Sequence, residues 1–231
     1  MTKKLTKNRK NIIKKISKKK YPLEESLNLL KELSFVKFDE SVDISVRLGI
    51  DVRLSNQIIK GSLILPHGSG KKKCILALVT KEKEKDVKKY GADYVGLDYI
   101  EKIKNGWTNI DVVISMPNVM NQIRSISKIL GPKGLMPSLN MGTVSVNPEK
   151  LVKEIKCGRI FFKSDRYGII HSSVGKISFS CKHLLENVKE FMKKLIHSKP
   201  PSSKGDYIKS IFLSTTMSNS ISVDHQIFVK K

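Results

Sequence analysis

Several features that mark other classes of protein are scarce or absent in this sequence. It has only three cysteines, which form no Cys-x-x-Cys pair, so neither a zinc site nor a disulfide framework is indicated. No apolar run approaches the roughly 18–20 residues that a membrane-spanning helix needs. The first residues, MTKKLTKNRK, are not followed by the apolar segment of a secretory signal. We therefore expect a protein of the reducing cytoplasm that has no membrane partner.

Acidic residues are also scarce relative to basic ones. The chain has 44 Lys and Arg against 21 Asp and Glu, which gives a net charge of +23. A compact protein with this charge repels itself unless a polyanion supplies counter-charge. Nucleic acid is the predicted partner, with an anionic membrane surface as the alternative. Residues 1–20 are strongly basic, and we expect a flexible arm on RNA phosphates there rather than an amphipathic helix on a membrane.

Both ends of the chain show the mixture of strands and helices that is typical of an α+β domain. Residues 41–49 alternate strictly between apolar and polar, which predicts a strand with one buried face. Helices are predicted at 21–34 and 182–200. Further strands are predicted at 58–66, at 207–215, at 221–229 and in a hairpin over 159–175 that turns at Asp165–Gly168.

The middle of the chain differs, because short apolar strands alternate there with helices. Strands are expected at 74–80, 92–96 and 110–117, and helices at 81–91, 97–106, 118–130 and 147–158, the last capped by Asn147. This order is typical of a parallel sheet. We predict a discontinuous α+β domain from residues 1–68 and 158–231, with a Rossmann-like α/β domain, residues 69–157, inserted at glycine hinges.

The segment GPKGLMPSLNMGTV, residues 131–144, combines glycine, proline and exposed-looking apolar residues in one loop. Two interpretations stay open. In the first, Leu135 and Met136 anchor a rigid connection in the core of the middle domain. In the second, the stiffened loop presents Lys133 to RNA or to the other domain.

No motif for catalysis or for a cofactor is present. The stretch HGSGKK, residues 67–72, lacks both the preceding glycine and the following Ser or Thr of a phosphate-binding loop, and no GxGxxG follows residues 74–80. The five histidines have no metal or triad spacing with Cys, Asp or Glu. We predict no catalytic residue, no cofactor and no metal.

Five ordered blocks give the chain a family resemblance. It resembles the bacterial large-subunit ribosomal protein L-one family, which forms the ribosome's mobile stalk. The blocks are KFDESVDISVRLGIDVR (37–53), LPHGSGK (65–71), GADYVG (91–96), LGPKGLMPSLNMGTV (130–144) and KGDYIKSIFLSTTM (204–217). The resemblance implies the same division into a discontinuous RNA-binding domain and an inserted Rossmann-like domain.

The resemblance also implies a function. It predicts a structural, non-enzymatic protein of the large ribosomal subunit that binds the stalk helices of 23S rRNA. It further implies contact with deacylated tRNA leaving the E site, and repression of translation from the protein's own operon mRNA. The alternative is an enzyme of RNA or nucleotide metabolism that uses the middle domain. Mononucleotide binding by residues 69–157 would favour that alternative.

Individual residues follow from the same resemblance. Phe38, Thr216 and Met217 fall where family members touch RNA, and Asp43 stands where the family usually has Glu. By residue type alone, Phe38 and Met217 would be core residues. Thr216 can offer its hydroxyl to a ribose 2′-OH. Lys133 is the RNA-binding candidate of the middle domain.

At two places the sequence departs from the family pattern. The usual Met-Gly-Pro-Gly turn reads Met217-Ser218-Asn219-Ser220. Because Ser is penalised where Gly adopts positive φ, we expect the contact at Ser218 to be looser or the turn to be reshaped. Leu139 and Asn140 stand where Pro and Lys are usual, so the middle domain has no basic side chain at that point.

Overall fold

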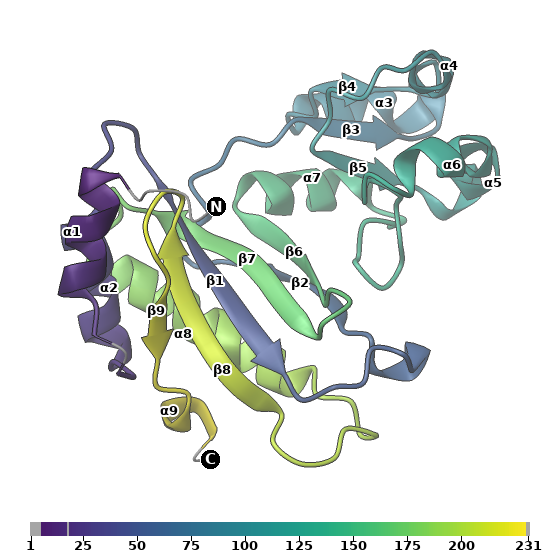
Figure 1. The fold of residues 1–231 in the computed structure, drawn as a ribbon. Coiled ribbons are helices and arrows are strands. Elements are labelled where there is room, and N and C mark those ends of the chain that lie inside the picture. The colour runs from purple at the N-terminus through teal and green to yellow at the C-terminus, as the bar shows by residue number, and fades with distance from the viewer. Residues whose placement is uncertain (1–5, 18, 230–231) are drawn as a thin grey trace. The chain divides into compact units, whose positions relative to one another are not determined.

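The computed structural model describes residues 6–17 and 19–229 (Figure 1). The protein is of mixed α/β type, and it divides into two compact units. Unit 1 consists of the chain up to Gly70 together with the chain from Ile160, and unit 2 consists of Lys71–Arg159. Gly68 and Gly70 lie where the chain passes from unit 1 to unit 2. Their φ angles are 69° and 67°, a conformation that favours glycine. That the units are independent domains stays a prediction.

A four-stranded antiparallel sheet in the order β7-β1-β8-β9 forms the centre of unit 1. The alternation predicted for the strand at 41–49 is confirmed. Its apolar residues are buried, whereas the polar residues between them are half-buried or exposed. One face of the sheet is therefore apolar and the other polar. The strands are β1 (Ser41–Leu48), β7 (Ile169–Lys176), β8 (Ile208–Thr215) and β9 (Ile221–Val223).

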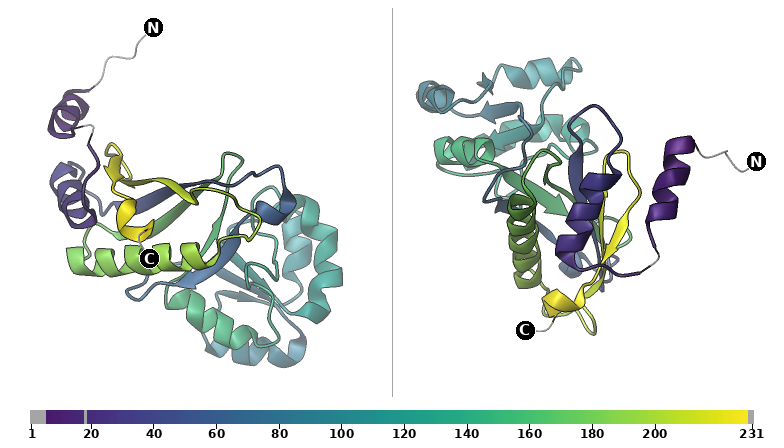
Figure 2. Two further views of the ribbon diagram at one scale, coloured as in Figure 1. Left: turned by 90° about the horizontal axis from the view of Figure 1, so that it is seen from below. Right: turned by 90° about the vertical axis from the view of Figure 1, so that its left-hand side faces the viewer.

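Two predicted helices, α2 (Leu23–Leu33) and α8 (Cys181–His197), pack on the apolar face. Helix α8 begins after Ser180, whose hydroxyl accepts the backbone N–H of His183 at 3.2 Å as an N-cap. The helices supply fully buried side chains such as Leu27 and Phe191 to the core. In the right-hand view of Figure 2, α8 lies on one side of the sheet and the N-terminal helix α1 on the other.

Helix α1 corrects the expectation of a flexible arm, because Lys7–Lys15 are helical. Its residue Ile12 is only 5% exposed and belongs to the core of unit 1. Burying an isoleucine side chain contributes about 1.5–3 kcal/mol, which favours a docked helix over a free chain. Within the predicted arm, residues 1–5 and 18 lie outside the described residues.

The predicted hairpin over 159–175 is confirmed as strand, turn and strand, but its two arms pair with each other only next to the turn, at Ser164 and Ile170. Strand β6 (Arg159–Lys163) joins β2 (Lys60–Ile64) in a separate two-stranded sheet, and β7 joins β1. Ser164 explains the difference, because its backbone N–H donates to the Ile59 carbonyl and its hydroxyl accepts the Ile59 N–H. The Asp165–Gly168 turn is present, with Gly168 at φ 72°.

The last predicted strand, 221–229, ends at Val223. Residues Gln226–Val229 form a short helix, α9, instead. The Asp224 carboxylate accepts the backbone N–H of Gln226 at 3.0 Å. Such a local side-chain bond offers the backbone an alternative to strand pairing, which explains the early end of β9.

Unit 2 contains the expected parallel sheet, in the order β4-β3-β5. All residues of β3 and β5 are buried, as apolar runs predict for strands covered on both faces. The strands are β3 (Ile75–Leu78), β4 (Tyr94–Val95) and β5 (Val112–Ser115); the longer helices are α3 (Lys81–Lys89), α4 (Tyr99–Lys104) and α7 (Pro148–Lys156). Asn147 precedes α7, but its side chain makes no capping hydrogen bond there.

The single helix predicted over 118–130 is broken into short turns. They are η2 (Pro117–Val119), α5 (Met120–Ile123), η3 (Arg124–Ile126) and α6 (Ser127–Leu130); the other 3-10 turn, η1 (Ser55–Gln57), belongs to unit 1. The hydroxyls of Ser125 and Ser127 donate to the carbonyls of Gln122 and Arg124, both at 2.8 Å. Serine side chains that bond the backbone in this way compete with regular helix hydrogen bonds. The apolar face itself is confirmed, with Val119, Ile123 and Ile126 buried.

Candidate nucleic-acid interface

The loop before β1 and the turn after β8 lie together at one end of the sheet of unit 1. Because the strands are antiparallel, the start of β1 lies beside the end of β8, and Val42 pairs with Thr215. The sequence places Phe38 in the loop and Thr216, Met217 and Ser218 in the turn. The structure thus brings together four candidates that are far apart in the chain.

Glu40 holds these two segments in place. It is a glutamate with only 1% of its surface exposed. One carboxylate oxygen accepts the backbone N–H of Met217 at 2.8 Å, and the other accepts the hydroxyl of Ser34 at 2.9 Å. Burying a carboxylate is costly unless it is hydrogen-bonded, and these donors offset the cost. Sequence reasoning missed Glu40, because an acidic residue before a strand usually lies at the surface.

The apolar candidates at this end of the sheet point outward instead of joining the core. Phe38 is 54% exposed and Met217 is 53% exposed. The interpretation of either residue as core is therefore wrong. Two large apolar side chains beside a buried, hydrogen-bonded support form a preorganised contact surface, suited to packing on a base or a ribose.

Thr216 and Ser218 use their hydroxyls within the turn. The Thr216 hydroxyl oxygen accepts the backbone N–H of Ser41 at 3.2 Å. The Ser218 hydroxyl accepts the N–H of Thr215 and donates to the carbonyl of Asn219, both at 3.3 Å. Among the described residues, only glycines have positive φ, so the strain expected at Ser218 is absent. The Ser218 hydroxyl is thus part of the turn, and both alternatives, a looser RNA contact and a reshaped turn, stay predictions.

Asp43 lies next to this cluster, on the polar face of β1. It is half-buried and pairs in register with Ser173 of β7 and Ser214 of β8. We call this face the open face. Its side chains are Asp43, Ser45, Arg47, Ile169, His171, Ser173, Ser210, Phe212, Ser214 and Ser222. Asp43 therefore connects the loop-and-turn cluster with the centre of the open face.

Lys133 belongs to unit 2 and so to a separate surface. Its ammonium donates to the Thr108 hydroxyl at 2.6 Å, and the side chain is exposed. In the same loop Leu135 and Met136 are half-buried, and Pro137 is buried. The interpretation that apolar residues anchor this loop in the middle domain is therefore confirmed in part, because these three residues are buried or half-buried. An RNA contact at Lys133 stays a prediction.

The two residues of that loop that differ from the family pattern, Leu139 and Asn140, lie at the surface. Leu139 is 74% exposed, and Asn140 is exposed as well. The loop closes on itself behind them, because the Ser138 N–H donates to the Thr143 hydroxyl at 2.8 Å. The loop keeps a fixed path, but it offers no positive charge at Asn140.

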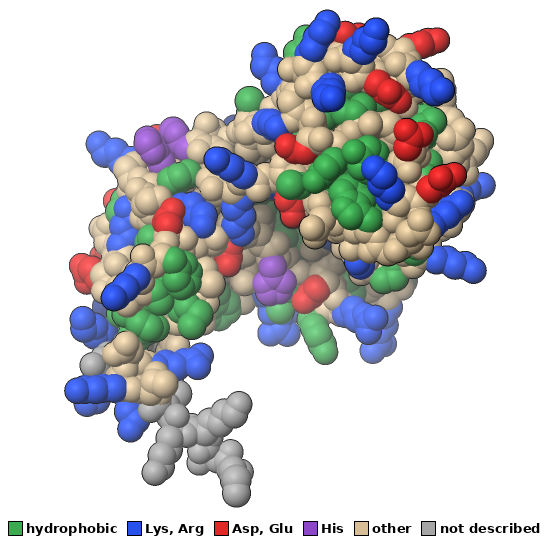
Figure 3. Space-filling view, turned by 90° about the horizontal axis from the view of Figure 1, so that it is seen from above, with side chains coloured by type: hydrophobic (Ala, Val, Ile, Leu, Met, Phe, Trp, Pro, Cys, Tyr) green, Lys and Arg blue, Asp and Glu red, His purple; other side chains and the backbone are tan. Residues whose placement is uncertain are grey.

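Other kinds of site find no support in the described part of the chain. No group of three or more His, Cys, Asp or Glu is placed to hold a metal ion within residues 6–17 and 19–229. Within the same ranges, no helix is long and apolar enough to cross a bilayer. The face seen in Figure 3 carries many Lys and Arg side chains, interspersed with Asp and Glu. The features of the surface that call for an explanation are therefore its positive charge and its exposed apolar side chains.

Comparisons with known proteins give one consistent result. Residues 30–219 match the model of the Ribosomal protein L1p/L10e family. The chain is 52% identical over 223 residues to the large ribosomal subunit protein uL1 of Phocaeicola vulgatus, which covers 96% of each chain. It is 50% identical to the protein of the same name from Flavobacterium psychrophilum, over 96% of this chain and 97% of the relative. The corresponding protein of Amoebophilus asiaticus is 48% identical over 96% of each.

Proposed function

The chain belongs to the Ribosomal protein L1p/L10e family, and from this membership we propose that it binds 23S rRNA as a structural protein of the large ribosomal subunit. It is a ribosomal protein and not an enzyme of RNA or nucleotide metabolism. Its place is the cytoplasm, in association with the ribosome. The net charge of +23 supports a polyanionic partner.

One observation carries the proposal for the RNA site. Glu40 fixes the loop of Phe38 against the turn of Met217, and both apolar side chains remain more than half exposed. Leaving two such side chains in water has no benefit for folding, because burial is what stabilises apolar surface. Contact with RNA bases and riboses accounts for their exposure. We assign rRNA binding to unit 1, and to Phe38, Asp43, Thr216, Met217 and Ser218 within it.

Two finer functions belong to the same proposal. We propose that the RNA site of unit 1 also recognises a similar structure in the protein's own operon mRNA, so that binding represses translation. We further propose that the protein contacts deacylated tRNA as it leaves the E site. Lys133 of unit 2 is the candidate residue for that second contact, since its charged side chain is exposed.

The test is a titration of the full chain with a fragment of 23S rRNA that carries the stalk helices. Phe38→Ala and Met217→Ala should each weaken binding by about 1–3 kcal/mol, the range of one base-stacking interaction. Leu139→Ala is the matched control, because it removes an even more exposed apolar side chain, in unit 2. If both unit 1 variants bind like the parent, the site lies elsewhere.

A further inference from the structure

One aromatic side chain of unit 1 is exposed in the middle of the sheet. Phe212 on β8 is 39% exposed, whereas its chain neighbours Ile211 and Leu213 are fully buried on the other face. The helices α2 and α8 cover only that other face. Phe212 is therefore an exposed aromatic residue of the open face.

Small polar residues surround the ring. In the sheet register, Phe212 lies opposite Ser45 of β1 and Ser222 of β9. Along its own strand, the next residues on the same face are Ser210 and Ser214. Because these side chains are short, none is long enough to cover the ring. Hydroxyl groups thus line the open face around Phe212, and the imidazole of His171 lies across Ser45 from it, with its Nδ1 2.9 Å from the Ser45 hydroxyl.

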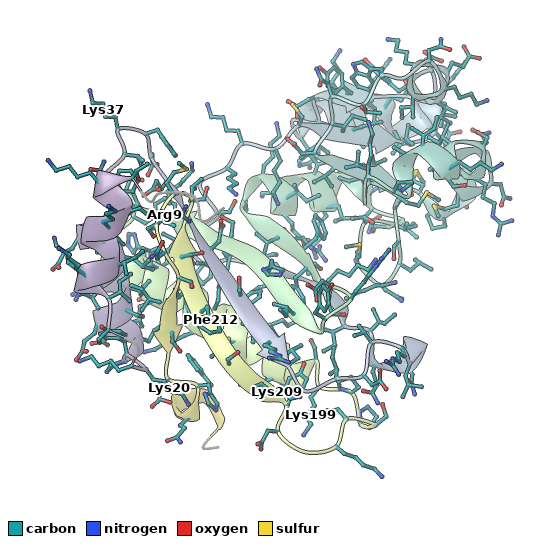
Figure 4. The ribbon with its side chains drawn as sticks, in the orientation of Figure 1. Arg9, Lys20, Lys37, Lys199, Lys209 and Phe212 are labelled. Carbon is teal, nitrogen blue, oxygen red and sulfur yellow. The ribbon has the colours of Figure 1, made fainter. Side chains whose placement is uncertain are left out.

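Positive charge borders this surface. Arg47 of β1 is exposed and lies diagonally across from Phe212, because it pairs with Ser210, two residue pairs along the register from the pair of Ser45 and Phe212. In Figure 4, Arg9 and Lys37 are seen toward one end of β8, and Lys20, Lys209 and Lys199 toward the other. Arg9 belongs to α1, which lies on the side of the sheet away from α8 (Figure 2). Phosphate groups on either side of Phe212 would meet these cations.

We propose that Phe212 stacks on one unpaired base of the bound RNA, and that Arg47 and Lys209, which both lie toward the start of β8, bind phosphates on that side of the base. This inference rests on the proposed RNA binding by unit 1 and extends it from the loop-and-turn cluster to the open face. It names the class of nucleotide: a base splayed out of the helix, at a bulge, a loop or a junction.

The geometry favours an unpaired base over a duplex. Bases inside a helix have both faces covered by their neighbours, so an aromatic ring can stack only on a base that has left the helix. A ring on a sheet surface, flanked by hydroxyls and cations, supplies the stacking face and the hydrogen-bond partners that such a base needs. Asp43, the one acidic side chain of the open face, can accept a hydrogen bond from a base amino group or a ribose hydroxyl.

Two substitutions separate stacking from simple apolar contact. Phe212→Leu keeps an apolar side chain of similar size but removes the aromatic face, and it should weaken stalk-RNA binding about 5- to 100-fold in Kd. Phe212→Trp should bind at least as tightly as the parent. Tyr90→Leu is the matched control, because Tyr90 is an aromatic residue of unit 2 that is 49% exposed. The Tyr90→Leu variant should bind stalk RNA as tightly as the parent.

Fluorescence gives a second readout that is independent of folding. The protein has one tryptophan, Trp107, in unit 2. In the double variant Phe212→Trp with Trp107→Phe, the only indole lies on the open face, and stacking should quench its emission when stalk RNA is added. Replacing the unpaired nucleotides of the RNA one at a time by abasic residues should abolish the quenching at one position. At that position, Phe212→Leu should cost no further affinity.

The outcomes distinguish the two levels of the proposal. If the parent does not bind stalk RNA, or Phe38→Ala and Met217→Ala bind normally, the proposed RNA site itself is wrong. If those variants bind weakly while Phe212→Leu binds normally and no quenching occurs, only the stacking inference is wrong. Normal RNA affinity of Phe212→Leu, combined with poor incorporation into the large subunit, would instead assign the open face to a protein partner and overturn the inference.

Discussion

The carboxylate of Glu40 accepts a hydrogen bond of 2.8 Å from the backbone N–H of Met217, a residue 177 positions later in the chain. This bond joins the first segment of unit 1 to its last. It also holds the turn of Met217 beside the loop that contains Phe38. Glu40 is thus a positioning residue of the proposed RNA site.

The first prediction concerns Glu40→Gln. Glutamine has a single acceptor oxygen, so it can serve either Met217 or Ser34 and must present an N–H₂ group to the other donor. We expect the free energy of unfolding in urea to fall by about 1–3 kcal/mol. RNA affinity should fall with it, because the turn loses its support. Glu32→Gln, an exposed position on α2, should leave both quantities unchanged.

Ser218→Gly tests the reshaped turn. The Ser218 hydroxyl bonds to the backbone of Thr215 and Asn219, and glycine would remove both bonds while adding freedom to the unfolded chain. We expect weaker binding to stalk RNA and a loss of stability of about 0.5–1.5 kcal/mol. Ser220→Gly, two residues on at an exposed position, is the control. Tighter RNA binding by Ser218→Gly would contradict this account of the turn.

Helix α1 should contribute to RNA affinity through its positive charge. Replacing Lys7, Lys10 and Lys14 by Gln should flatten the dependence of log K for stalk RNA on log salt, by roughly 0.7–0.9 for each ion pair with a phosphate that the substitutions remove. The three lysines are exposed, so stability should not change. The same substitutions at Lys81, Lys85 and Lys88 on α3 provide a control in unit 2. An unchanged slope for the α1 variant would show that this helix does not touch phosphates.

Alkaline pH should lower the stability of the protein through the ionisation of Tyr207. Its hydroxyl donates to the Leu195 carbonyl at 3.0 Å, and burial raises the pKa of Tyr207 above the ordinary value of 10.0. A raised folded-state pKa gives stability that is complete below the unfolded pKa and is lost as pH rises above it. Tyr207→Phe should therefore be less stable than the parent near pH 7, and the gap should narrow above about pH 10. Melting curves at several pH values test this; a constant gap would contradict it.

Unit 2 should fold on its own. Its sheet is buried by residues of the same unit, and Trp107 packs against Tyr94 and Tyr99 with ring centroids 4.9 and 5.2 Å apart. We expect the isolated segment 71–159 to show the same Trp107 emission as the full chain and to melt cooperatively. The complementary protein, with this segment replaced by a short glycine linker, should keep most of the affinity for stalk RNA. A segment without cooperative melting would contradict the division into domains.

Most local elements of the fold followed from short-range patterns, and so did the parallel sheet of unit 2, but the pairing of β6 with β2 in unit 1 did not. The alternation in 41–49 predicted β1 and its buried face, because a period of two residues is a property of any strand. The pairing of β6 with β2 and the end of β9 at Val223 were not predicted, because Ser164 and Asp224 form side-chain bonds that no periodicity reveals. The helix over 118–130 failed for the same reason at Ser125 and Ser127.

For the candidate site, the sequence by itself determined the family; it also predicted a nucleic-acid partner from the charge, and Phe38, Thr216 and Met217 as candidate residues. Motif blocks and net charge are properties of the chain, independent of how it folds. Only the tertiary structure decided that Phe38 and Met217 are exposed, that Glu40 is buried between them, and that Phe212 faces away from the core. Those facts depend on which strand lies beside which, and pairing across 177 residues is set by the packing of the whole sheet.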